Sequence, residues 1–152
     1  MEFKTVTPED MMNVGKKIGM LLKSGDTILL YGELGSGKST LVKGIAEVLG
    51  VKETANSPTF TLMNVYDIKK DNIKKLVHVD TYRLKDQQDL EDIGIDEYMR
   101  DENSVCIFEW PDKLGNLMQD KNPIKITIEY LDKERRKILV EGVGLTNISF
   151  KK

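Results

Sequence analysis

The chain has 152 residues, of which 32% are charged and 39% hydrophobic, and its formal net charge at pH 7 is −2. This size and composition predict one soluble globular domain over residues 1–152, and the acidic balance argues against a surface that grips bare nucleic acid. A single cysteine, no membrane-length apolar run and no signal-peptide segment predict a cytoplasmic protein with no internal disulfide and no membrane contact.

The first elements are a strand and a helix. Glu2–Val6 is typical of an edge strand, and Thr7 then fits the N-cap of a helix with Pro8 in its first turn. Asp10 stands where a capping box usually has Glu. The helix ends near Ser24-Gly25, and its buried stripe comprises Met11, Val14, Ile18, Leu21 and Leu22.

The central pattern is Gly32–Ser39, GELGSGKS, which satisfies G-x-x-x-x-G-K-[S/T] at every fixed position. An apolar run suited to a buried strand, Thr27–Tyr31, precedes it, and apolar residues at helical spacing follow as far as Gly50. Glycines let the loop turn its N–H groups inward, and the helix adds its positive dipole end. The pattern predicts a nucleoside triphosphate site in which Lys38 reaches the β- and γ-phosphates and Ser39 holds Mg²⁺.

Two further apolar runs end in a carboxylate. After a hairpin turn at Lys69–Asn72, Leu76–Val79 leads into Asp80, and later Val105–Phe108 leads into Glu109. Ligands of open α/β sheets bind outside the carboxyl ends of the strands. We therefore expect one carboxylate to hold Mg²⁺ and the other to polarise the attacking water, although either alone is also compatible with an ordinary strand end.

The remaining segments carry weaker indications. Thr59 and Thr61 lie in a loop that suits either a γ-phosphate sensor or a plain turn, and the lone His78 suits a structural hydrogen bond better than a catalytic base. Gln87–Arg100 predicts two short helices separated by Gly94. A final hairpin comprises Ile124–Tyr130, a turn at Asp132–Arg136, and Ile138–Val143. Without an Asn-Lys-x-Asp motif for guanine, ATP is the expected nucleotide.

Four motifs occur in a fixed order: the glycine loop Gly32–Thr40, Asn56–Thr61 (NSPTFT), His78–Leu84 (HVDTYRL) and Phe108–Pro111 (FEWP). Over nearly the whole chain this order resembles the TsaE (YjeE) family, P-loop ATPases of bacterial tRNA threonylcarbamoyladenosine biosynthesis. The resemblance implies an α/β fold with a P-loop NTPase-like sheet, flanking helices and antiparallel hairpin additions. It also implies ATP hydrolysis with Mg²⁺ in partnership with TsaB and TsaD, of which TsaD modifies adenosine 37, so that tRNA is met only indirectly.

The resemblance also implies roles for individual residues. Asp80 and Lys38 become catalytic, and Glu109 is both catalytic and, with Ser39, a metal contact. The expected nucleotide contacts are Glu33, Leu34, Gly35, Ser36, Gly37, Lys38, Ser39, Thr40, Thr7, Thr59, Trp110 and Arg135. Thr7 and Arg135 are the residues expected near the adenine base. Thr7 is also compatible with a plain helix cap, and Arg135 with a solvated turn.

Two alternatives remain open. A small-molecule kinase would use the same loop to transfer the γ-phosphate to a hydroxyl, but such enzymes usually place several arginines over that phosphate, and this chain has four in all. A nucleotide-gated scaffold, in which the bound shape matters more than turnover, fits the sequence equally well.

Overall fold

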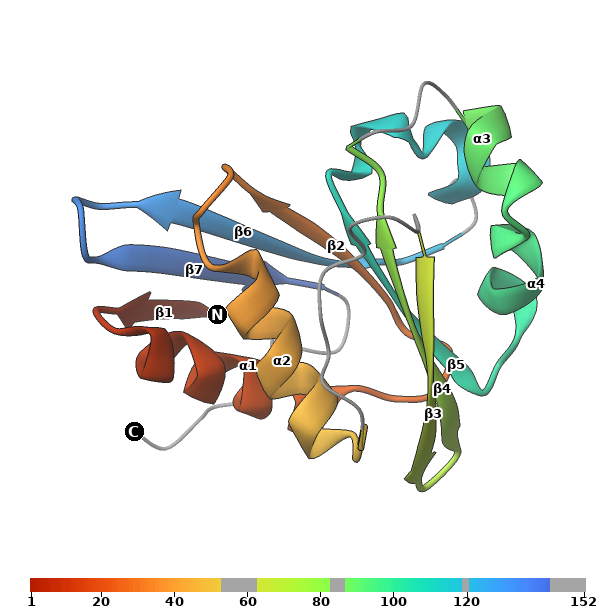
Figure 1. Ribbon diagram of the computed structural model, residues 1–152, viewed down its shortest axis with the longest axis horizontal. Coiled ribbons are helices and arrows are strands. Elements are labelled where there is room, and N and C mark those ends of the chain that lie inside the picture. Colours follow the sequence, from red (N-terminus) through yellow and green to blue (C-terminus); the bar gives the residue numbers. More distant parts are fainter. Residues whose placement is uncertain (53–62, 83–86, 119–120, 143–152) are drawn as a thin grey trace.

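The computed structural model describes residues 1–52, 63–82, 87–118 and 121–142. In these residues seven strands form one sheet in the order β1-β7-β6-β2-β5-β4-β3 (Figure 1). The strands are β1 (Glu2–Thr5), β2 (Thr27–Gly32), β3 (Met63–Lys70), β4 (Ile73–Asp80), β5 (Ser104–Glu109), β6 (Ile124–Tyr130) and β7 (Arg136–Glu141). The helices are α1 (Pro8–Leu21), α2 (Lys38–Val48), α3 (Gln87–Asp92) and α4 (Ile95–Arg100), with 3₁₀ turns at Pro111–Lys113 and Gly115–Met118.

The middle of the sheet is parallel and its two sides are antiparallel. Strands β4, β5, β2 and β6 run parallel to one another. Strand β3 pairs antiparallel with β4, and β7 pairs antiparallel with both β6 and β1. The carboxyl ends of β2, β4 and β5 therefore meet at one edge. This arrangement confirms the predicted α/β sheet with flanking helices and hairpin additions.

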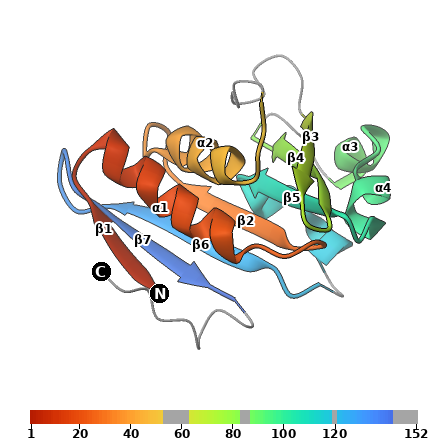
Figure 2. The same ribbon diagram turned by 90° about the horizontal axis from the view of Figure 1, so that it is seen from below.

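Both faces of the central strands are covered. Helices α1 and α2 pack on one face, where Leu30, Leu76 and Ile107 belong to their hydrophobic cluster, and Figure 2 shows these helices together on one side of the sheet. Val79 and Phe108 point to the opposite face and pack with α3 and α4. Strands buried on both faces have continuous apolar sequences, which is the pattern that predicted them.

Helix α1 begins as its sequence predicts. The Thr7 hydroxyl accepts a hydrogen bond from the Asp10 N–H at 3.0 Å, and the Asp10 carboxylate accepts one from the Thr7 N–H at 3.0 Å. This is a complete capping box with Asp in place of Glu. The pair fixes the point at which the chain leaves β1 and enters α1.

Helices α1 and α2 cross backbone to backbone. A Cβ atom built on Gly15 would lie 2.2 Å from the Leu41 carbonyl oxygen, and one on Gly44 would lie 2.2 Å from the Met12 carbonyl oxygen. Only glycine fits at these two positions. The crossing therefore sets how α2, whose first residue is Lys38, lies against α1.

The other expected elements are also present, with small shifts at their ends. Helices α3 and α4 are separated by Gly94, which has a left-handed φ of +84°. Strand β7 begins at Arg136 instead of Ile138, because Arg136 already pairs with Tyr130 across the hairpin. None of the helices in the described ranges is long and apolar enough to span a membrane.

Candidate active site at the carboxyl ends of the parallel strands

The glycine loop joins β2 to α2 as predicted. Gly35 and Gly37 have φ values of +78° and +106°, a region that residues with a side chain rarely adopt. Gly37 is the N-cap of α2 and supplies no capping side chain, so the first-turn N–H groups of the helix face the space in front of the loop. A Cβ on Gly32 would lie 2.6 Å from Ser36 Oγ, so a side chain at this position would force Ser36 to move.

Lys38 is buried inside this loop. Its Nζ donates hydrogen bonds to the carbonyl oxygens of Gly32 and Glu33, the latter at 3.1 Å, and lies 4.3 Å from the centre of the Trp110 ring. Burial lowers the pKa of Lys38, whereas the negative charges of Glu109 and Asp80 act in the opposite direction. The ammonium group therefore lies within the glycine loop, close to the two carboxylates that the sequence placed beside the phosphates.

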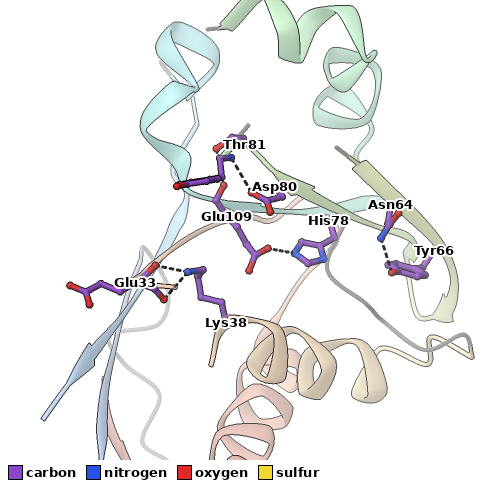
Figure 3. A network of polar contacts seen from close by, with 10 residues as sticks. Glu33, Lys38, Asn64, Tyr66, His78, Asp80, Thr81 and Glu109 are labelled. Carbon is purple, nitrogen blue, oxygen red and sulfur yellow. Dashed lines mark hydrogen bonds and ion pairs between the residues drawn. The ribbon is translucent and has the colours of Figure 1, made fainter. Parts of the chain in front are cut away.

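The two carboxylates lie on the same side of the sheet as Lys38. Asp80 and Glu109 are direct partners in the parallel β4–β5 register, and Glu109 is two residues beyond Ile107, which faces α1 and α2. Figure 3 shows Lys38 and Glu109 directed toward the same space in front of α2, with Asp80 beside it.

One cleft contains most of the predicted site. It has a volume of about 380 Å³. Its lining residues are Leu34, Gly35, Gly37, Lys38, Ser39, Thr40, Asp80, Glu109 and Trp110. These residues come from the loop, the start of α2 and the ends of β4 and β5, which is where an α/β sheet binds its ligand.

The two carboxylates differ in exposure and in hydrogen bonding. Asp80 is half-buried, and its Oδ1 accepts a hydrogen bond from the Tyr82 N–H at 2.9 Å. Glu109 is only 3% exposed, and its Oε2 lies 3.1 Å from His78 Nε2. The more exposed group suits contact with a water molecule, and the enclosed one suits a fixed ligand position.

His78 makes the structural hydrogen bond that the sequence favoured, with a partner that the sequence did not predict. It is only 1% exposed and lies in β4, two residues before Asp80, on the same face of the strand. The His-x-Asp spacing indicates that shared face. The bond to Glu109, 31 residues away, depends on the register of β4 with β5, which spacing does not give.

A second cleft of about 330 Å³ adjoins the loop. It shares Gly35, Gly37 and Thr40 with the first cleft and extends to Thr7 and Ser36. The described lining residues from the late hairpin are Lys133, Glu134 and Arg136.

Arg135 is not among the described lining residues of this second cleft. Its Nε donates to Asp132 Oδ2 at 2.6 Å, whereas the neighbouring Arg136 lies 4.0 Å over the Tyr130 ring. The geometry therefore favours Arg136 over Arg135 at this end of the site. Glu33 lines a third cleft together with Trp110, and Thr59 lies outside the described residues.

The side chains present are suited to Mg²⁺ only in part. Ser39, Asp80 and Glu109 bring hydroxyl and carboxylate oxygens to one cleft, which are the ligands Mg²⁺ prefers. Among the described residues no group of three or more His, Cys, Asp or Glu forms a cage for a metal ion. The set fits a cation that takes its remaining ligands from phosphate oxygens and water.

Known proteins match this chain along most of its length. The family model described as "Threonylcarbamoyl adenosine biosynthesis protein TsaE" matches residues 5–138. Two proteins named tRNA threonylcarbamoyladenosine biosynthesis protein TsaE are similar to it. The one from Bacillus subtilis is 36% identical over 147 residues, covering 95% of this chain and 87% of that protein. The one from Streptomyces coelicolor is 38% identical over 138 residues, covering 88% and 91%.

A solved structure agrees with these matches. The crystal structure of Bacillus subtilis YdiB superimposes with a TM-score of 0.74 at 30% identity, over 95% of this chain and 86% of that one. The extent of the family match, together with the identities of these relatives, shows that the chain belongs to the TsaE family.

Proposed function

We propose that this protein is a P-loop ATPase that hydrolyses ATP with Mg²⁺ in the biosynthesis of tRNA N6-threonylcarbamoyladenosine, acting with TsaB and TsaD. The names of its relatives support the pathway. One observation carries the ATPase activity: the glycine loop, Lys38 and two carboxylates line a single cleft. With a net charge of −2, we assign contact with tRNA to the partners.

In this mechanism the loop binds the triphosphate. The N–H groups of the loop and of the first turn of α2 donate to phosphate oxygens. Lys38, now bonded to the Gly32 and Glu33 carbonyl oxygens, exchanges these acceptors for β- and γ-phosphate oxygens. Desolvation makes that exchange favourable, because a buried ammonium group is stabilised more by an anion than by a neutral carbonyl.

The carboxylates complete the site. Ser39 and Glu109 would hold Mg²⁺, which would supply positive charge to neutralise that of the triphosphate. Asp80 has one oxygen fixed by the Tyr82 N–H, and we assign its Oδ2 to orienting the attacking water. The expected catalytic set is therefore Lys38, Asp80 and Glu109, as the resemblance implied.

The positions of the described arginines support a kinase less well than an ATPase. Arg100, Arg135 and Arg136 are described, and none of these three lines the cleft of Lys38 and Glu109. The transferred phosphate of a kinase would need such positive charge near it. Hydrolysis needs only a water molecule at that position.

The test measures ATP turnover by the purified protein alone and mixed with TsaB and TsaD. Release of ADP and inorganic phosphate that rises with the partners and is lost in Lys38→Ala is the expected result. A rate unchanged by the partners, together with a phosphorylated small molecule as product, would establish the kinase instead.

A further inference from the structure

The pair formed by His78 and Glu109 is a buried polar contact beside the cleft. The side chains are 1% and 4% exposed, and Nε2 and Oε2 are 3.1 Å apart (Figure 3). A carboxylate moved out of water is strongly destabilised unless a donor compensates for its lost hydration. His78 supplies such a donor, so the contact holds Glu109 in place inside the protein.

The surroundings of the ring determine which nitrogen carries the proton. Because Oε2 of an ionised Glu109 can only accept, His78 Nε2 must donate. Nδ1 is buried and has no hydrogen-bond partner among the described residues. The bond to Glu109 therefore requires a proton on Nε2, whichever form Nδ1 takes.

We propose that His78 is a positioning residue that fixes the Glu109 carboxylate so that its other oxygen, Oε1, faces the cation beside the triphosphate. This inference rests on the proposed function, because it uses the assignment of Glu109 to Mg²⁺. The parallel register supports it: His78 and Asp80 share one face of β4, and Glu109 stands opposite Asp80. Hydrogen-bond partners of metal-binding carboxylates typically change metal affinity or activity 10- to 100-fold when removed.

The test compares three variants. His78→Leu removes the donor, His78→Gln places an amide N–H near the position of Nε2, and His78→Asn places one near Nδ1. With TsaB and TsaD, we expect His78→Leu to lower kcat, or raise the Mg²⁺ concentration for half-maximal rate, about 10-fold or more. His78→Gln should restore most of that loss and His78→Asn should not.

Two binding and spectroscopic measurements separate this role from general damage. The affinity of His78→Leu for ATP should stay within about threefold of the parent without Mg²⁺ and fall when Mg²⁺ is added. Since the chain has one histidine, ¹⁵N labelling gives a single imidazole spectrum, in which Nε2 should be protonated at neutral pH. This spectrum uses the parent protein and therefore does not depend on the folding of any variant.

Three results would overturn the inference. They are an Nε2 without a proton, parent-like kinetics and Mg²⁺ dependence in His78→Leu, and equal rescue by His78→Gln and His78→Asn. A parent protein that neither binds nor hydrolyses ATP would instead refute the proposed function, and the metal assignment with it.

Discussion

The crossing of α1 and α2 gives the sharpest stability prediction. In Gly15→Ala the new methyl group would start 2.2 Å from the Leu41 carbonyl oxygen and 3.1 Å from the Gly44 Cα. Both are backbone atoms, so no side-chain rotation relieves the contact, and the helices must separate by about 1 Å to reach ordinary packing distance. Gly19→Ala is the matched control in the same helix, where the nearest atom, the Ile45 carbonyl oxygen, is at 3.1 Å.

The magnitudes follow from two opposing effects. Each change gains about 1 kcal/mol from the higher helix propensity of alanine. Overpacking costs about 1–3 kcal/mol and occasionally more, and Gly15→Ala belongs at the upper end because the contact is rigid. We expect a net loss of about 2 kcal/mol for Gly15→Ala and a change within about 0.5 kcal/mol for Gly19→Ala.

Urea denaturation of both variants and the parent measures these free energies of unfolding. For a domain of this size the loss in Gly15→Ala corresponds to a Tm about 4–8 °C below the parent. If Gly15→Ala were as stable as Gly19→Ala, the two helices would not cross as closely as described and the reasoning would fail.

Three further predictions concern single groups. Lys38→Ala should abolish ATP binding measured by calorimetry. Asp80→Asn and Glu109→Gln should lower turnover, measured by phosphate release, about 100-fold while the Kd for ATP stays within about threefold of the parent. Parent-like turnover in both carboxylate variants would refute the pairing of Asp80 with Glu109. Burial raises the pKa of the Cys106 thiol to about 12. A thiol reagent at pH 8 should therefore modify Cys106 only as fast as the protein unfolds. Rapid labelling of the folded protein would contradict this prediction. Burial raises the pKa of Asp26 above 3.8. The contribution of Asp26 to stability is therefore fully present below pH 3.8 and is lost as the pH rises through its pKa in the folded protein. Asp26→Asn should be more stable than the parent at pH 7 but not at pH 3, as urea titrations at both pH values would show.

The sequence predicted the parts of the site that depend on local pattern. The glycine loop is specified by neighbouring residues. Asp80 and Glu109 lie at the ends of two strands of the sheet, as predicted, because each follows an apolar run. In each case the information lies within about ten residues of chain, where periodicity and turn chemistry operate.

What the sequence could not give depends on pairing between distant segments. Nothing local indicates that β4 pairs with β5 or in which register, and so the partner of His78 was not predicted. Which arginine of the late turn lines the second cleft could not be predicted for a related reason. It depends on which residue of the turn first pairs with β6, and that residue is Arg136, opposite Tyr130.

The register between β4 and β5 thus determines whether the residues of the proposed site lie together. A slip of one residue between β4 and β5 would move Glu109 to the face of α3 and α4 and separate it from both His78 and Lys38. The opposite face resists such a slip, because Val77 pairs with Cys106 and Val79 with Phe108, and all four side chains are buried in one hydrophobic cluster. The apolar core beneath the sheet therefore determines the position of the carboxylates above it.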